Sequence, residues 1–515
     1  MARFASRLIS LFAVVCLALP THAKPTATRA KKSAAKAAVT TSIPSLQQQI
    51  EKLVVPNPLR AGTVGVYAVD AKTGKVLVNI NGETPLKPAS CNKLITTAAG
   101  LTILGPNFKF VTELLRNGDI QNGTLQGDLI VKGGGDPTIS GRFEKNKKDV
   151  TATMRQFAQK LKAAGITQIT GDLIADDRIF DRIVFHPTWY PRERGEWYEA
   201  EIWGLSFNDN CVDLTWSAKG QLAGDRVNLV INPPNTYANV KNEVRVAATG
   251  RDSGRSYRRE DRSNDIIATG ALTIGTEKED SASIYNGAEY FLSVFRDVLT
   301  SEGITVAGKS RLIDEKKDAA AATKAVSILK HESPPLSEVL AVINRNSQNF
   351  YADSLIKMLG RIKREEGSFT AGTSVAHDFC LKNGLYAKGH EMVDGSGLSP
   401  KNKVSPRQLV EIIRFMDKGP NHDVWRNSLP IGGNRGTLKA RFQQTTESQA
   451  LASRIYGKTG LIGGVRSLSG IVTGTDGRDI YYCVNANDFS AAADEVLNLL
   501  DKVAVTMARE VNPKQ

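Results

Sequence analysis

The fold of this 515-residue chain is decided mainly by one stretch, Pro88-Ala89-Ser90-Cys91-Asn92-Lys93-Leu94-Ile95-Thr96-Thr97-Ala98-Ala99. Pro88 and Ala89 favour a turn into a helix, and Leu94, Ala98, Leu101 and Leu104 follow at helical spacing. Gly105-Pro106 ends this predicted helix. Ser90 and Lys93 are three residues apart, so on a helix they share one face within a single turn.

A serine and a lysine in this arrangement have the chemistry of a nucleophile and its base. A serine hydroxyl is a poor nucleophile at neutral pH and needs an adjacent base. A lysine can be that base if burial and neighbouring cations lower its pKa. The start of a helix adds backbone N–H groups and a positive dipole end, which suit an oxyanion. The competing interpretation is that the serine caps the helix and the lysine is a surface charge.

The same short patterns recur elsewhere, so context has to choose among them. Among the S-x-x-K matches we select Ser90–Lys93, because only Ser90 follows a turn that opens a helix. For the other two patterns we select Ser347-Gln348-Asn349 (S-x-N) and Lys458-Thr459-Gly460 (K-T-G). The remaining matches are Ser33–Lys36, Ser327–Lys330, Ser354–Lys357, Ser206-Phe207-Asn208 and Lys72-Thr73-Gly74, the last within a predicted hairpin turn.

Other catalytic patterns are missing from the sequence. It contains no G-x-S-x-G, no H-E-x-x-H and no complete phosphate loop, and its six histidines show no ligand spacing. There is also no C-x-x-C. We therefore expect neither a metal site nor a cofactor.

The N-terminal region is predicted to be an export signal followed by a linker. Residues 1–23 have two arginines, an apolar run and a small-x-small site after Pro20, which is typical of a cleaved secretory signal. Residues 24–43 are rich in Ala, Thr, Ser and Lys and are predicted to be a flexible basic tether. No later apolar stretch is long enough to span a bilayer, so the mature chain is expected to be periplasmic or secreted, without a transmembrane anchor.

Composition places the rest of the chain among ordinary globular proteins, with 41% hydrophobic and 23% charged residues. Seven of the net +14 charges lie in residues 1–43, and the +7 that remains comes without an aromatic and basic stripe, so we expect no nucleic-acid partner. Four cysteines follow the signal, and the sequence does not decide how they pair: Cys91, Cys211, Cys380 and Cys483.

Helices and strands alternate at both ends of the chain around a middle rich in short strands. This pattern predicts an α/β protein in which one domain, residues 44–112 and 325–512, is interrupted by an insertion, residues 113–324. Within the insertion, Gln168 to Ala175 is predicted to be one strand, and residues 250–265 an exposed loop. The last helix is predicted to bury Val496, Leu499, Leu500, Val503 and Met507.

The motifs, taken in order, resemble those of the low-molecular-mass class C penicillin-binding proteins, the D-alanyl-D-alanine carboxypeptidase/endopeptidases of peptidase family S13. The resemblance runs from about residue 44 to 511, and the 257 residues between Ser90 and Ser347 match a family that carries two extra domains there. It implies an α+β sandwich of β-lactamase/transpeptidase type, with a third domain nested at about 195–285. Its further motifs are Gly133-Gly134-Gly135-Asp136-Pro137, Asp394-Gly395-Ser396-Gly397-Leu398-Ser399 and Gly436-Thr437-Leu438.

The resemblance also implies roles for the residues that match. Ser90 attacks the carbonyl of the penultimate D-alanine and Lys93 accepts its proton. Ser347 relays a proton to the leaving amine, and Asn349 orients Lys93 and the substrate amide. Lys458 and Thr459 bind the terminal carboxylate, Lys458 also polarises Ser347, and the backbone N–H groups of Ser90 and Leu461 form the oxyanion hole. Gly460 is expected to line the substrate site with them, and Asp176 to contact the diamino-acid side chain of the stem peptide.

Some residues depart from the family pattern. Cys91 and Asn92 replace small hydroxyl residues, and Arg435 stands where the family has an aspartate. We expect Cys91 and Asn92 to face away from the cleft and activity to be retained. Ser396 is interpreted as part of a turn that shapes the cleft, not as a nucleophile.

The predicted function is that of a serine DD-peptidase acting on peptidoglycan stem peptides, with β-lactam antibiotics as inhibitors. It would remove terminal D-alanine, cut D-alanyl cross-links, or do both, and the sequence decides neither this balance nor the oligomeric state. One alternative on the same scaffold is a β-lactamase with Glu365 or Glu366 as the deacylating base. Another is a cell-wall or β-lactam binding protein that is acylated without turnover.

Overall fold

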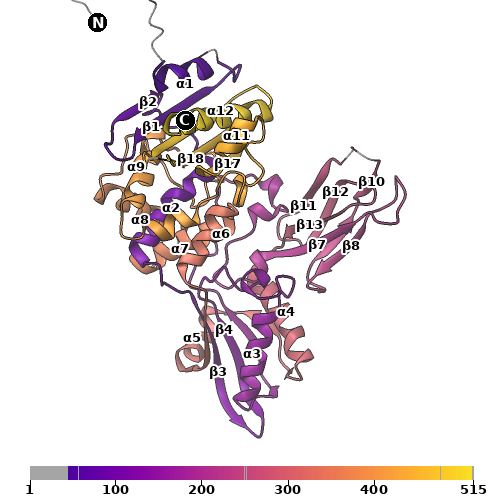
Figure 1. Cartoon of the computed structure of the whole chain (residues 1–515). Coiled ribbons are helices and arrows are strands. Elements are labelled where there is room, and N and C mark those ends of the chain that lie inside the picture. Colours follow the sequence, from indigo (N-terminus) through magenta and orange to yellow (C-terminus); the bar gives the residue numbers. More distant parts are fainter. Residues whose placement is uncertain (1–43, 56, 249, 251, 476, 513–515) are drawn as a thin grey trace, which may run out of the picture. The chain divides into compact units, whose positions relative to one another are not determined.

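The structure, a computed structural model, describes residues 44–55, 57–248, 250, 252–475 and 477–512. Its largest helical region surrounds a five-stranded antiparallel sheet with the order β17-β18-β19-β1-β2 (Figure 1). β1 pairs with β19, so segments from opposite ends of the chain form the centre of this sheet. The strands are β1 Thr63–Asp70, β2 Val76–Ile80, β17 Ile455–Ile462, β18 Val465–Val472 and β19 Ile480–Asn487.

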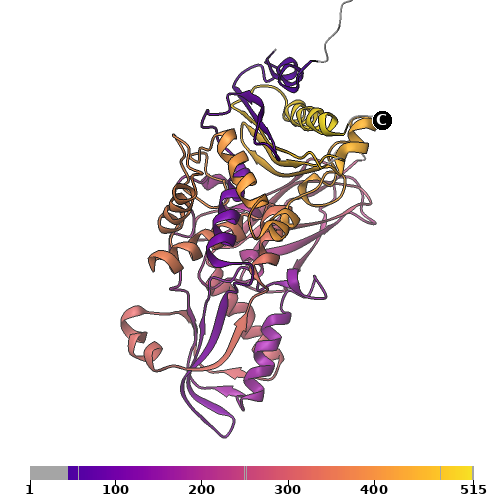
Figure 2. The ribbon, with the colours of Figure 1, turned by 60° about the vertical axis from the view of Figure 1, so that its left-hand side comes forward.

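Helices cover both faces of this sheet, which is why β19 is buried along its whole length. One face carries α1 Leu46–Val54, α11 Thr446–Ala452 and α12 Ala493–Val511 around one apolar core (Figures 1 and 2). The other face carries a larger core formed by α2 Lys93–Leu104, α6 Leu336–Arg345, α7 Asn349–Arg364, α8 Phe369–Lys382, α9 Pro406–Asp417 and α10 His422–Ser428. The predicted inward residues of α12 are buried, which confirms that prediction: Val496, Leu499, Leu500, Val503 and Met507.

The middle of the chain forms a seven-stranded sheet with its own core. Here β4 pairs with β3 on one side and with β5 and β6 on the other, and α3 and α4 cover the sheet (Figure 1). Its elements are β3 Val111–Gln121, β4 Thr124–Lys132, α3 Ala152–Ala163, β5 Gln168–Ile169, β6 Leu173–Asp176, α4 Gly287–Ser301, β14 Thr305–Val306, β15 Ser310–Leu312, α5 Glu315–Lys324 and β16 Val326–Glu332.

Two smaller sheets occupy the part of the insertion that was expected to be a nested domain. Four short 3-10 turns precede their strands in the chain: Gly141–Phe143 follows β4, and Pro191–Glu193, Trp197–Glu199 and Asn208–Asn210 lie between β6 and β7. Their strands are β7 Cys211–Ser217, β8 Asn228–Asn232 and β13 Glu277–Ser283 in one sheet, and β9 Asn239–Asn242, β10 Arg245–Ala247, β11 Gly254–Arg259 and β12 Asp265–Thr273 in the other.

The structure corrects three sequence-based boundaries. Residues 250–265 are not simply an exposed loop: β11 lies within them, and Arg259 is buried in an ion pair with Glu201 at 3.0 Å, so its charge does not mark the surface. The strand predicted from Gln168 to Ala175 is two strands, because the chain is interrupted at Gly171, where a Cβ would lie 2.6 Å from the backbone of Gly127. β16, which the division at residue 325 assigned to the catalytic domain, pairs with β3 of the inserted sheet.

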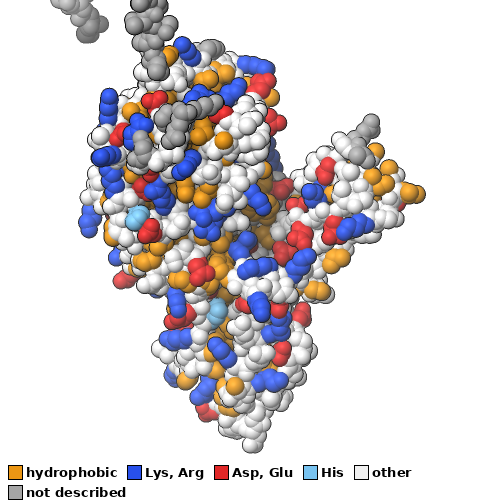
Figure 3. Space-filling model, in the orientation of Figure 1, with side chains coloured by type: hydrophobic (Ala, Val, Ile, Leu, Met, Phe, Trp, Pro, Cys, Tyr) orange, Lys and Arg blue, Asp and Glu red, His pale blue; other side chains and the backbone are white. Residues whose placement is uncertain are grey.

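The predicted signal and tether, with Ser33–Lys36, lie outside the described residues. Within the described residues no helix combines the length and apolar character that crossing a bilayer requires. Cys91, Cys211, Cys380 and Cys483 are all buried as free thiols. On the face shown in Figure 3, Asp and Glu side chains lie among the Lys and Arg side chains.

We predict that Leu500→Ala lowers the free energy of unfolding by about 2–5 kcal/mol, because Leu500 is fully buried between α12 and the five-stranded sheet. Lys502→Ala, at an exposed position on the same helix, should change it by less than about 0.5 kcal/mol. Denaturant unfolding of both variants tests this, and equal losses would contradict the assignment of α12 to the core.

Candidate active site

Ser90 lies in a 3-10 turn, Ala89–Asn92, and the α-helix begins only at Lys93, slightly later than predicted. Ala89 has a φ of 47°, a left-handed conformation that costs a non-glycine residue about 1–2 kcal/mol. Two glycines pack tightly against this turn: a Cβ on Gly397 would lie 1.9 Å from the Ala89 carbonyl oxygen, and one on Gly460 would lie 2.6 Å from the carbonyl oxygen of Pro88. Close packing therefore holds the turn that presents Ser90.

The amine of Lys93 connects three segments that are far apart in the sequence. Its Nζ lies 2.9 Å from Ser90 Oγ, 2.6 Å from Asn349 Oδ1 and 2.7 Å from the backbone oxygen of Ser396. The side chain is completely buried. The S-x-x-K and S-x-N motifs selected from the sequence thus meet at one atom.

This geometry suits an unprotonated amine. The amide oxygen of Asn349 and the carbonyl of Ser396 can only accept, so they take two N–H groups, and the remaining direction points at the Ser90 hydroxyl. Burial lowers the pKa of Lys93 well below its usual value, and the positive charge of Lys458 lowers it further. In the neutral amine the third direction is a lone pair, to which the Ser90 hydroxyl can donate.

Lys458 and Ser347 form a second contact between motifs. Lys458, buried on β17, donates from Nζ to Ser347 Oγ at 2.8 Å and to the backbone oxygen of Thr459 at 2.7 Å. Burial lowers its pKa to about 8. Ser347 has a left-handed φ of 59° and forms part of the turn between α6 and α7.

The other predicted substrate residues follow along β17. Thr459 Oγ1 donates to Thr437 Oγ1 at 2.8 Å, which brings the G-T-L motif beside the K-T-G motif. The side chain of Leu461 is exposed, so a role for this residue rests on its backbone. A hydroxyl group on the Lys458 ammonium, that of Ser347, and a second hydroxyl on the next residue of β17, that of Thr459, are a combination that suits a carboxylate.

The residues that depart from the family pattern face away from these groups. Cys91 is fully buried, and its Sγ donates to the backbone oxygen of Lys458 at 3.1 Å. Burial raises the pKa of the Cys91 thiol, which disfavours a nucleophilic thiolate. Asn92 is also buried and donates to the backbone oxygen of Asp394. Arg435 donates to the backbone oxygens of Leu429 and Asn427.

Sequence reasoning missed Asp353, a carboxylate that holds the turn around Ser396. Asp353, one helical turn after Asn349, accepts from the backbone N–H groups of Gly395 and Ser396 at 2.7 and 3.0 Å. Burial and the charge of Asp394 raise the pKa of Asp353 to about 8. Ser396 itself is fully buried, and its backbone, not its hydroxyl, contacts Lys93. The one available signal was the i, i+4 spacing of Asn349 and Asp353.

Two other sequence candidates are not joined to these groups. Both carboxylate oxygens of Asp176 accept from Arg178 at 2.8 Å, and no hydrogen bond among the described residues links Asp176 to Ser90, Lys93, Ser347 or Lys458. Glu365 follows the 16-residue helix α7, which begins at Asn349. At 1.5 Å per residue this places Glu365 and its neighbour Glu366 about 24 Å from the S-x-N motif.

A serine hydroxyl against a buried lysine amine, with a second buried lysine on β17 of an α/β sandwich, is the arrangement expected of an acyl-transferring serine enzyme. The model of the D-Ala-D-Ala carboxypeptidase 3 (S13) family matches residues 46–509. The chain therefore belongs to this family, and the expected enzyme class, a serine-type D-Ala-D-Ala carboxypeptidase, is confirmed.

Individual relatives agree with this assignment. The D-alanyl-D-alanine carboxypeptidase of Actinomadura sp. (strain R39) is 29% identical over 481 residues, covering 90% of this chain and 84% of that protein. D-alanyl-D-alanine carboxypeptidase DacB of Haemophilus influenzae is 27% identical over 434 residues, covering 83% and 86%. The crystal structure of penicillin binding protein 4 (dacB) from Haemophilus influenzae has a TM-score of 0.75 at 24% identity, covering 89% of this chain and 99% of that one, which confirms the predicted fold class.

We predict that Gly460→Ala lowers kcat/KM for a peptide ending in D-Ala-D-Ala by at least about tenfold, a loss of about 1.4 kcal/mol. The added Cβ would lie 2.1 Å from Ser467 Oγ and 2.6 Å from the Pro88 carbonyl, so β17 must move away from the Ser90 turn. Gly463→Ala is the matched control on the same hairpin, because nothing lies within 4 Å of its Cβ. Equal activity of the two variants would contradict the close-packing argument.

The pH dependence should be bell-shaped. With Lys93 as the predicted base, activity should rise as pH increases through the lowered pKa of Lys93, because the base must be neutral. With Lys458 as the predicted cation, activity should fall as pH rises above about 8, where Lys458 loses its charge. Lys458→Arg keeps its charge at these pH values and should move the alkaline limb upward, whereas Lys93→Arg cannot act as a base and should abolish turnover. The kcat/KM profile of D-alanine release measures both, and an alkaline limb unchanged in Lys458→Arg would contradict the assignment.

Proposed function

We propose that this protein works outside the cytoplasm on peptidoglycan stem peptides, where it removes terminal D-alanine and cleaves D-alanyl cross-links. The observation that carries the proposal is the 2.9 Å contact between Lys93 Nζ and Ser90 Oγ, made by an amine whose pKa is lowered by burial. The extracytoplasmic site of action rests on the predicted signal at residues 1–23 and tether at 24–43. The two-domain insertion at about residues 113–324 is proposed to frame the substrate.

In the proposed mechanism, Ser90 Oγ attacks the carbonyl carbon of the penultimate D-alanine while its proton passes to Lys93 Nζ. The backbone N–H groups of Ser90 and Leu461 stabilise the resulting oxyanion. Collapse breaks the C–N bond, and Ser347, polarised by Lys458, relays the proton that Lys93 took up to the leaving amine, so that Lys93 becomes neutral again and Ser347 keeps its hydroxyl. Water then hydrolyses the ester and regenerates Ser90.

The remaining proposed roles concern binding. Lys458 and Thr459 are proposed to hold the terminal carboxylate, with Gly460 allowing β17 to lie against the Ser90 turn. Asn349 is proposed to orient Lys93 together with the substrate amide. A contact of Asp176 with the diamino-acid side chain would be made by the Asp176–Arg178 pair, since Arg178 already occupies both carboxylate oxygens.

β-Lactams are proposed to acylate Ser90 as mimics of the D-Ala-D-Ala end. Penicillin binding protein 4 from Haemophilus influenzae, which shares this fold, has been solved in complex with a β-lactam. The β-lactamase alternative loses its predicted base, because Glu365 and Glu366 lie at the far end of α7. Slow release of the acyl group is therefore expected.

We predict that fluorescent penicillin labels the purified protein at Ser90, and that Ser90→Ala loses both the label and the release of D-alanine from muropeptides. Cys91→Ala is the matched control and should keep both, since the thiol is buried and bonded to the Lys458 backbone. Mass spectrometry of the protein and of the muropeptides measures the two activities together. Labelling that survives in Ser90→Ala and disappears in Cys91→Ala would falsify the mechanism, and labelling without peptide turnover would favour the binding protein.

A further inference from the structure

The turn that carries Ser347 is held by residues of the insertion at the two positions that follow the serine. Asn349 donates from Nδ2 to the backbone oxygen of Tyr198 at 2.7 Å. Between Ser347 and Asn349, Gln348 donates from Nε2 to Asp209 Oδ2 at 2.8 Å. Tyr198 and Asp209 lie about 140–150 residues earlier in the chain, within the insertion.

Gln348 does not act as a local cap for the helix that follows it. It occupies the N-cap position of α7, yet its side chain makes no capping hydrogen bond and reaches Asp209 instead. The side chain is buried, and in the described part of the chain its Oε1 has no partner. A buried amide committed to a single distant carboxylate links the position of this turn to that carboxylate.

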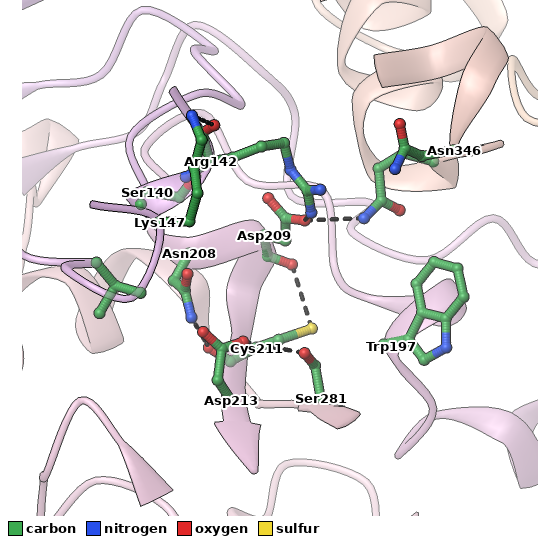
Figure 4. Close-up of a pocket in the computed structure, with 13 residues that line it drawn as sticks. Ser140, Arg142, Lys147, Trp197, Asn208, Asp209, Cys211, Asp213, Ser281 and Asn346 are labelled. Carbon is green, nitrogen blue, oxygen red and sulfur yellow. Dashed lines mark hydrogen bonds and ion pairs between the residues drawn. The ribbon is translucent and has the colours of Figure 1, made fainter. Parts of the chain in front are cut away.

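Asp209 is itself held firmly. Arg142 donates to the same oxygen, Oδ2, at 2.6 Å, and the guanidinium of Arg142 lies 5.7 Å from the ring centre of Tyr351 on α7. Arg142 and Asp209 meet beside a cavity of about 500 Å³ (Figure 4). Gln348 and Asn346 also line this cavity. The Asp209 carboxylate therefore joins the insertion to the start of α7 through a charge-assisted hydrogen bond.

The backbone at both ends of this link has an unusual conformation. Ser347 and Asp209 have φ values of 59° and 56°, which non-glycine residues adopt only when surrounding contacts hold them there. The Ser347 Oγ must nevertheless meet Lys458 Nζ at 2.8 Å. A contact that fixes Gln348, the residue next to Ser347, therefore affects where the Ser347 hydroxyl lies, and with it the proposed proton relay.

We propose that Asp209 is a positioning residue for Ser347: held by Arg142, it fixes Gln348 and thereby keeps the Ser347 hydroxyl on Lys458. The insertion would then support the catalytic turn in addition to framing substrate. This inference rests on the proton-relay role proposed for Ser347 above.

The test compares two substrates with the same acyl group and different leaving groups. A peptide needs its leaving amine protonated, whereas a thioester releases a thiolate that needs no proton. Gln348→Glu places a second carboxylate against Asp209, so the turn should shift and kcat for the peptide should fall at least about tenfold, with KM and thioester kcat changed by less than about threefold. Asp209→Asn keeps the shape of the side chain and should show a smaller loss of the same selectivity.

The double variant Gln348→Glu/Asp209→Asn supplies the rescue. It reverses the direction of the hydrogen bond, because the amide introduced at position 209 can donate to the carboxylate introduced at position 348. Peptide kcat should then return to within about threefold of wild type. Asp280→Asn is the matched control: Asp280 also accepts from an arginine, Arg255, at 2.7 Å within the insertion, and should leave both substrates unaffected. Thermal melting checks that every variant is folded.

Three outcomes would overturn the proposal: wild-type peptide kcat in Gln348→Glu, an equal loss on both substrates, or no rescue in the double variant. If Gln348→Glu does not fold, Asp209→Asn alone decides between a selective loss of peptide turnover and no selective loss. Ser347→Ala tests the proton-relay role of Ser347 separately from the positioning role of Asp209. If Ser347→Ala leaves peptide turnover intact, the proton-relay role of Ser347 is wrong. If Ser347→Ala loses peptide turnover and Gln348→Glu keeps it, only the positioning role of Asp209 is refuted.

Discussion

The buried amine of Lys93 is the interaction on which the rest of the site depends. Three segments supply its neighbours: the turn before α2, the start of α7 and the turn at Ser396. A charged amine is costly in such surroundings, and the cost lowers its pKa toward the neutral form that a base requires. All three neighbours must be in place for this amine to make its hydrogen bonds. The positions that the Lys93 amine requires are therefore the same positions that the packing of the helical core produces.

A second buried lysine, Lys458, lowers the pKa of Lys93 further. Lys458 raises the energy of protonated Lys93, and it is itself partly destabilised as a cation, with a pKa of about 8. The two lysines are distinguished by their neighbours, since Lys93 meets the Ser90 hydroxyl and two acceptors, whereas Lys458 meets the Ser347 hydroxyl and the backbone oxygen of Thr459. In the proposed mechanism the same residue type would supply both a base, Lys93, and a fixed cation, Lys458.

The segment between β6 and β7 also meets the helical core at several polar contacts. Trp189 donates from its indole to Asp394 at 2.8 Å, and buried Lys357 on α7 binds Asp181 at 2.7 Å. Asn349 and Gln348 add the contacts to Tyr198 and Asp209. Each contact reaches α7 or the turn around Ser396, so the insertion is attached to the elements that surround Lys93.

The sequence by itself determined the motifs shared with the family, the helix behind Ser90, the α/β class of the fold and the buried face of α12, because these depend on local spacing and periodicity. Only the tertiary structure selected Asp353, Asp209 and the backbone oxygens of Ser396 and Tyr198. A backbone carbonyl has no residue-type signal, and a carboxylate among many in the chain gains its role only when folding places it beside a distant turn. The burial of Arg259 followed the same rule, since its partner Glu201 lies 58 residues away and no local pattern reports that pairing.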